Sequence, residues 1–180
     1  MSISRVTARY AKSLIELASE RGELETVKKD MDYFLGALQS RELVLFLKSP
    51  IISADKKRSV FHAVFDGKIS KTTFEFFRIV IQKGREEYLQ EIVKEFIEQY
   101  KQIKGISTVT ITTAAPMTES ALSEIKAKLL ASNETMDKLD IHTLVDPDII
   151  GGFIIEIGDK SYDASVAHTL ENLKKELTAN

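Results

Sequence analysis

The stretch KQIKGISTVTITTAAP, residues 101–116, marks a change in the periodicity of the sequence. Before Gly105, apolar residues recur at the three- and four-residue spacing of amphipathic helices. Over positions 108–112, polar and apolar residues instead alternate as they do in a β-strand. Because Gly105 is also a typical C-terminal stop for a helix, we predict a domain boundary here, between residues 1–105 and residues 106–180.

Residues 1–105 have the pattern of six short amphipathic helices joined by brief links. Ser53 and Ser70 stand just before two of these helices, where a serine hydroxyl can accept a hydrogen bond from the first turn. Gly84 and Gly105 follow the fifth and sixth helices, as expected for C-terminal stops. Short helices with brief connections form compact bundles, so the sequence predicts a six-helix bundle.

Residues 106–180 alternate between strand and helix patterns. The first strand is followed by a helix from about Thr118, and a second strand surrounds Ile141. A segment rich in glycine and aspartate then leads into a last helix, which Asp163 or Ser165 can cap. The predicted fold class is therefore α+β, an N-terminal six-helix bundle followed by a small α/β C-terminal domain with a short sheet and two helices.

The composition is that of a soluble globular protein, with 43% hydrophobic and 29% charged residues among 180. The formal net charge of -2 gives no general attraction to nucleic acid or anionic lipid, so nucleic acid is not expected as a partner. Cysteine is absent, which excludes disulfides and thiolate chemistry. The apolar runs are much too short to span a bilayer, so no direct membrane insertion is expected.

The segment VDPDIIGGFIIEIGDKSYDAS, residues 145–165, is where phosphate or metal binding has to be considered. Its glycines match neither the Walker loop nor the dinucleotide fingerprint, because Gly151 and Gly152 lead into a strand and not into a helix N-terminus. Its aspartates lack the calcium-loop pattern, since isoleucines stand at two of the ligand positions. These glycines and aspartates are predicted to shape turns, a hairpin and a close backbone approach.

The other residues that could carry chemistry are scattered. His62, His142 and His168 are far apart in the sequence, and each is expected at the surface or its boundary. No serine lies in a G-x-S-x-G elbow, and KKR at 56–58 is balanced by neighbouring acidic residues. We therefore predict no catalytic residue, no cofactor and no metal site, and we expect that the protein is not an enzyme.

Small residues on the first helix leave two explanations open. Ala8, Ala11 and Ala18 leave shallow places between larger side chains, and the fifth helix ends at Gly84. Such a surface can form a groove for an amphipathic helix of another protein. The same alanines can instead allow close packing inside the bundle.

Four blocks of the sequence carry a family resemblance that spans essentially the whole chain. They are ARYAKSLIELA at 8–18, FFRIVIQKGREEYLQEIVKEF at 76–96, VTITTAAPMTE at 109–119 and VDPDIIGGFIIEIGDKSYDASVAHTLENL at 145–173. Each block alone is moderately specific, and their order and spacing together are highly specific. The chain resembles the delta subunit of F-type ATP synthases, called the oligomycin-sensitivity-conferring protein in mitochondria.

The resemblance implies a non-catalytic stator subunit that links the catalytic head of a proton-translocating ATP synthase to its peripheral stalk. In this family a six-helix domain holds the N-terminal helix of an alpha subunit in a groove between its first and fifth helices. The C-terminal domain engages the b subunits of the stalk. The residues that the resemblance places in the groove, some of which can instead be core, are Tyr10, Ala11, Leu14, Val80, Ile81 and Gly84.

The start of the first helix close to Met1 favours a bacterial protein, peripheral on the cytoplasmic face of the plasma membrane. The sequence departs from the family pattern at Thr169, where a basic residue is frequent. Two other functions stay open at this point. The chain could be a generic helix-binding adaptor, or a ligand-binding domain that uses residues 145–165.

Overall fold

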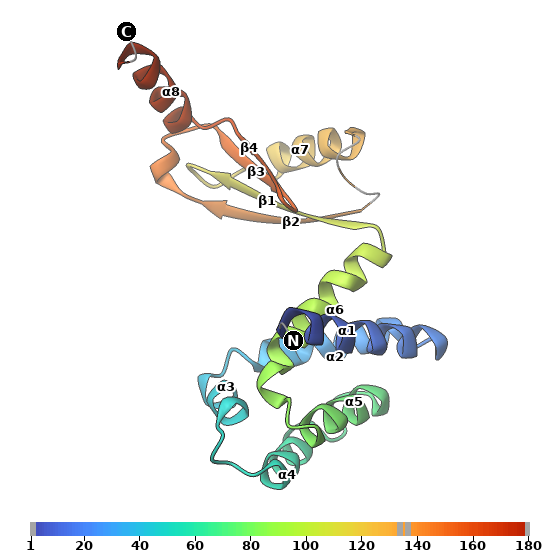
Figure 1. Ribbon diagram of the computed structural model, residues 1–180. Helices are drawn as coiled ribbons and strands as arrows, with labels where there is room; N and C mark the ends of the chain where they lie inside the picture. Colours follow the sequence, from blue (N-terminus) through green and yellow to red (C-terminus); the bar gives the residue numbers. More distant parts are fainter. Residues whose placement is uncertain (1–2, 133–134, 136–137, 179–180) are drawn as a thin grey trace. The chain divides into compact units, whose positions relative to one another are not determined.

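The computed structural model of the chain describes residues 3–132, 135 and 138–178. The chain divides into two compact units, Met1–Tyr100 and Lys101–Asn180 (Figure 1). The division falls within the last helix of the bundle. The assignment of separate functions to residues 1–105 and 106–180 stays a prediction.

The predicted six α-helices of the N-terminal part are confirmed. They are α1 (Ile3–Glu20), α2 (Leu24–Ala37), α3 (Arg41–Lys48), α4 (Ala54–Phe65), α5 (Lys71–Gln82) and α6 (Leu89–Ile103), and a 3-10 turn, η1 (Glu86–Tyr88), precedes α6. Ser53 and Ser70 cap α4 and α5, because their hydroxyls accept hydrogen bonds from the N–H groups of Lys56 and Thr73. Gly105 follows α6 with a φ of +63°, which glycine adopts without strain.

Phenylalanine rings form the centre of the bundle. Phe34 of α2, Phe61 and Phe65 of α4, and Phe77 of α5 are all buried. Their ring centroids lie 4.6 Å apart for Phe34 and Phe77, and 4.6 Å apart for Phe61 and Phe65. These separations are those of favourable aromatic pairs, so three helices share one aromatic core.

Polar contacts hold the beginning of α5 against α2 and the link between α1 and α2. The buried carboxylate of Asp30 on α2 accepts hydrogen bonds from the Ser70 N–H at 2.9 Å and the Thr73 hydroxyl at 2.7 Å. The Thr72 hydroxyl accepts from Arg21 at 3.1 Å and donates to Glu23 at 2.6 Å. Hydrogen bonds at buried and partly buried positions are costly to break, so the N-terminal end of α5 has a fixed position.

The second unit contains a four-stranded mixed sheet. The strands are β1 (Ile106–Thr113), β2 (Lys138–Val145), β3 (Phe153–Ile157) and β4 (Lys160–Asp163), in the order β2-β1-β3-β4. β1 pairs in parallel with β2 and antiparallel with β3, and β3 and β4 form a hairpin. The helix α7 (Glu119–Ala131) connects the two parallel strands. The fold class predicted from the sequence is confirmed.

One face of the sheet packs on α7, and α8 (Val166–Thr178) does not lie on the sheet. Val109 and Ile111 of β1 and Leu129 of α7 are the buried centre of this small core. Figure 1 shows α8 running away from the end of the sheet, and none of its described residues is buried. The helix α8 therefore contributes little to the hydrophobic core of the second unit.

Candidate partner-binding surfaces

Four of the six residues that the resemblance places in a head-binding groove lie in the core of the bundle. Ala11 and Leu14 on α1 and Val80 and Ile81 on α5 have exposed fractions of 0, 1, 0 and 0%. A side chain that is already covered buries no further surface when a partner binds. These four residues can hold the two helices in place, but they offer no surface of their own.

Tyr10 and Gly84, the other two predicted residues, lie at the border between α1 and α5. The half-buried Tyr10 ring meets the Phe76 ring of α5 edge-on, with centroids 6.3 Å apart. Gly84 follows the C-terminal end of α5 with a φ of +64°, and the Arg85 guanidinium lies 5.5 Å from the centre of the Tyr10 ring. The structure thus joins these two positions through Arg85, in a cation–π contact that the sequence did not indicate.

Apolar residues follow this border on both helices. Val6 and Leu17 are half-buried and share a helical face with Tyr10, from which they are separated by four and seven residues. Ile79 follows Phe76 by three residues on α5 and is 47% exposed. We call these five residues, Val6, Tyr10, Leu17, Phe76 and Ile79, the α1–α5 seam. Of these five, only Tyr10 was among the residues predicted for the groove. The others were missed, because the helix pattern does not distinguish exposed apolar positions such as Ile79 from the core.

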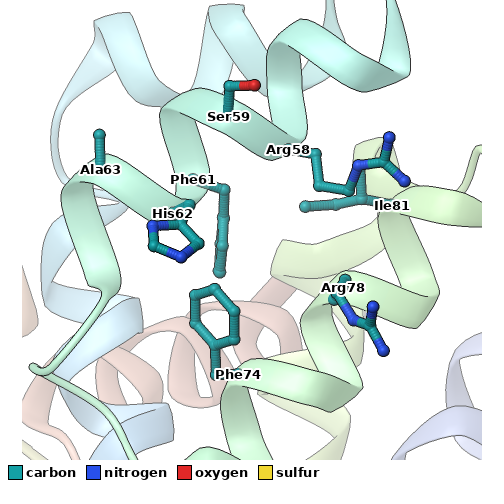
Figure 2. A pocket seen from close by; sticks show the side chains of 8 residues that line it. All are labelled: Arg58, Ser59, Phe61, His62, Ala63, Phe74, Arg78 and Ile81. Carbon is teal, nitrogen blue, oxygen red and sulfur yellow. The ribbon is translucent and has the colours of Figure 1, made fainter.

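A pocket of about 450 Å³ lies between α4 and α5 (Figure 2). Phe61 and Ile81 are buried beneath it, and Phe74 stands against Phe61 with ring centroids 6.0 Å apart. Arg58 and Arg78 lie at its rim, one from each helix. Phe74, Arg78 and Ile81 share the face of α5 that is turned away from Phe76, so the pocket and the α1–α5 seam use different faces of this helix.

The C-terminal helix α8 carries an exposed apolar stripe. Val166, Leu170, Leu173 and Leu177 have exposed fractions of 42, 51, 49 and 81%. Their spacing of four, three and four residues is the spacing of the apolar positions in a coiled coil. Thr169, where the family often has a basic residue, donates its hydroxyl hydrogen to the Ser165 carbonyl, so it serves the first turn of the helix.

The glycine- and aspartate-rich segment shapes backbone, as predicted. A Cβ on Gly152 would lie 2.2 Å from the Ala164 carbonyl oxygen, so only glycine allows the two chain segments to approach this closely. The Asp146 carboxylate accepts the Asp148 N–H at 3.0 Å and so caps the start of η2 (Pro147–Ile149). Asp163 accepts the Ser165 N–H at 2.8 Å, and hydrogen bonds from Ser165 lower the pKa of its carboxyl. These contacts use the carboxylates to form turns and favour no ligand.

The three histidines are exposed, as expected. Each lies beside an aspartate, and the shortest of these N–O distances is 3.4 Å, between His142 and Asp140. Within the part of the chain that the structure describes, no three His, Asp or Glu side chains are grouped so that they could hold a metal ion. None of the described helices is long and apolar enough to cross a membrane.

Exposed apolar surfaces on both units are typical of a protein that binds other proteins. The family model of the ATP synthase delta (OSCP) subunit matches residues 6–177. The chain therefore belongs to the ATP synthase delta (OSCP) subunit family. It is a non-catalytic subunit of an ATP synthase, a membrane-bound complex, and the expectation that it is not an enzyme is confirmed.

Relatives with the name ATP synthase subunit delta match almost end to end. The protein from Cytophaga hutchinsonii is 37% identical over 179 residues, covering 99% of this chain and 97% of the relative. The protein from Flavobacterium johnsoniae is 36% identical over 181 residues, covering 99% of each chain. A chain of the cryo-EM structure of the Toxoplasma gondii mitochondrial ATP synthase hexamer shares the fold, with a TM-score of 0.76 and 21% identity over 97% of this chain and 98% of that one.

Proposed function

We propose that this chain is the stator subunit that links the catalytic head of an F-type ATP synthase to its peripheral stalk, so that rotor torque is coupled to ATP synthesis. The observation that carries the proposal is that the family match spans both units, each of which keeps an exposed apolar surface. Two surfaces on two units are what a link between two partners requires. The subunit acts from the cytoplasmic face of a bacterial plasma membrane, as a peripheral protein.

The N-terminal unit binds the head through the α1–α5 seam. An amphipathic helix, the N-terminal helix of an alpha subunit, lies along the seam and covers the exposed face of Ile79 and the edge of Tyr10. The buried Ala11, Leu14 and Val80 support this surface from beneath, whereas Ile81 lies on the opposite face of α5, under the α4–α5 pocket. The buried hydrogen bonds of Asp30 and Thr72 hold α5 in place, so little ordering cost accompanies binding.

Isothermal titration of the full chain with a peptide of the alpha-subunit N-terminus tests this surface. Ile79→Glu places a carboxylate in the apolar contact and is expected to weaken binding at least tenfold. Val64→Glu on α4 is the matched control, because Val64 is 39% exposed and lies outside the seam. Equal affinities of wild type and Ile79→Glu would rule out the seam as the head-binding surface.

The C-terminal unit binds the b subunits of the stalk through the apolar stripe of α8. A stripe of this spacing packs well against another helix, because leucines at such positions insert between the side chains of the facing helix. The exposed leucines have no other role that the structure shows, since no described residue of α8 is buried. Covering them removes apolar surface from water, which stabilises the contact.

Leu170→Glu tests the stripe in a binding assay between the full chain and the soluble part of the b subunits. The substitution is expected to weaken binding at least tenfold while the circular dichroism spectrum stays unchanged. Asn172→Glu introduces the same charge on the opposite side of α8 and should bind like the wild type. If both variants bind normally, the stalk contacts another part of the C-terminal unit.

The two contacts reinforce each other. Once one unit is bound, the other is held near its own partner, so its effective concentration is high and the link survives transient opening of either contact. Because the two contacts are in series, torque on the head loads both of them, and a contact that opens briefly can close again before the link is lost. This property suits a stator, which has to resist rotation without dissociating.

A further inference from the structure

The α4–α5 pocket combines an apolar interior with a cationic rim. Its volume of about 450 Å³ falls in the range of about 300–1,000 Å³ that is usual for small-molecule sites. Phe61 and Ile81 are 4 and 0% exposed, so they form a fixed base, and the half-buried Phe74 ring forms one wall. His62 stands edge-on to Phe74, with ring centroids 5.4 Å apart.

The charges around the pocket favour an anion. None of the eight described side chains that line it is acidic, whereas Arg58 and Arg78 contribute two guanidinium groups. Figure 2 shows both guanidinium groups on the Ile81 side of the two phenyl rings in this view. A ligand with its apolar part against the rings can therefore present a carboxylate to the arginines.

The existing partners of the two arginines do not prevent this. Arg58 pairs with Asp55, and Arg78 pairs with Glu75, each three residues away on the same helix. The arginine side chains are 45 and 51% exposed, and ion pairs at such positions contribute only about 0–1 kcal/mol. A guanidinium group has five donors, so it can keep its acidic neighbour and also bind a ligand carboxylate.

We propose that the α4–α5 pocket is a binding site for a small amphiphilic anion, an aromatic or branched apolar body that carries one carboxylate. The apolar body packs against Phe61 and Phe74, and the carboxylate lies between Arg58 and Arg78. The site is independent of the proposed stator contacts, because it lies on the face of α5 opposite the α1–α5 seam and on a different unit from α8.

Titration of the isotope-labelled full chain with naphthalene-2-carboxylate, followed by amide NMR shifts, tests the site. Saturable shifts are expected in α4 and α5, with a Kd of about 0.1–1 mM for a ligand of this size. Naphthalene-2-carboxamide, which has the same shape without the charge, should bind at least fivefold more weakly. Two results would overturn the proposal: shifts that do not saturate by about 5 mM ligand, fivefold above the highest expected Kd, or saturable shifts only outside α4 and α5.

A double variant, Arg58→Gln with Arg78→Gln, tests the role of the rim. Both side chains are about half exposed and, among the described residues, pair only with neighbours on their own helix, so the fold should be retained and the affinity for the carboxylate should fall at least fivefold. Arg41→Gln on α3 removes an exposed arginine outside the pocket and should leave the affinity unchanged. Equal affinity of the double variant and wild type, or equal binding of carboxylate and carboxamide, would contradict an anion site.

Discussion

Gly152 is required by the approach of two backbone segments in the C-terminal unit. Its φ of +77° disfavours other residues, and any Cβ would meet the Ala164 carbonyl oxygen. Gly152→Ala is therefore expected to destabilise the C-terminal unit by about 3 kcal/mol, which protection of the β3 amides from hydrogen exchange measures. Gly158 is the matched control: it has a φ of +60° with open space around it, so Gly158→Ala should cost only about 1 kcal/mol. Equal effects of the two substitutions would show that the close approach has no energetic role.

Tyr100 of α6 makes the stability of the bundle depend on pH in alkaline solution. Burial and the hydrogen bond from its hydroxyl to Glu25, at 2.8 Å, raise the pKa of Tyr100 to about 12. Because the folded-state pKa is raised, this contribution is complete below the ordinary pKa of about 10 and is lost as the pH rises toward 12.

Urea unfolding of the wild type and of Tyr100→Phe at a series of pH values measures this contribution. The stability difference between them should be constant up to about pH 10 and should shrink, or reverse in favour of Tyr100→Phe, as the pH approaches 12. A difference that does not change over this range would mean that the tyrosine titrates alike in the folded and unfolded chains.

At the scale of elements, a buried ion pair joins three helical segments of the bundle. The Lys57 ammonium of α4 donates to the Leu47 carbonyl at the end of α3, at 2.8 Å, and to Glu86 of η1, at 2.6 Å. Lys57 is 3% exposed, and the second carboxylate oxygen of Glu86 has no hydrogen-bond partner among the described residues. The negative charge of the Glu86 carboxylate is therefore balanced by the Lys57 ammonium.

Lys57→Met is expected to destabilise the protein by about 3 kcal/mol in urea unfolding, because it leaves the Glu86 carboxylate buried without a cation. Lys57→Met combined with Glu86→Leu should recover most of that loss, since both charges are then absent. The neighbouring exposed Lys56→Met should change the stability by less than about 0.5 kcal/mol. A double variant that is less stable than Lys57→Met alone would contradict this explanation.

Elements and their ends could be predicted from the sequence where a local cause decides them. Ser53, Ser70 and Ser165 cap helices as expected, because capping depends on residues within one turn. The turn at residues 147–152 and the β3–β4 hairpin also follow from local glycine and aspartate chemistry.

The sequence could not show which apolar stripes are buried, because the burial of a helix face depends on segments that are far apart in the sequence. Leu14 of α1 and Leu170 of α8 belong to similar stripes, yet Leu14 is 1% exposed and Leu170 is 51% exposed. For this reason the residues named from the resemblance include four that the structure buries, and the exposed Ile79 was not among them. The α4–α5 pocket was missed as well. Its residues come from two helices, and the spacing of apolar residues within each helix does not show how the two helices pack together.

At the scale of the whole molecule, the proposed function requires both units to act in one chain. The α1–α5 seam belongs to one unit and the α8 stripe belongs to the other. A chain with one defective surface should therefore keep its fold and its remaining partner, but it should fail to transmit force between head and stalk.

ATP-driven proton pumping is the most direct test of this claim. Membranes stripped of the catalytic head are combined with heads that lack the delta subunit, and acidification of the vesicles is followed with a pH-sensitive dye. Wild-type chain should restore pumping, whereas Ile79→Glu and Leu170→Glu should leave ATP hydrolysis by the head intact and pumping low. Pumping that stays absent with the wild-type chain, or that both variants restore fully, would contradict the proposed stator function.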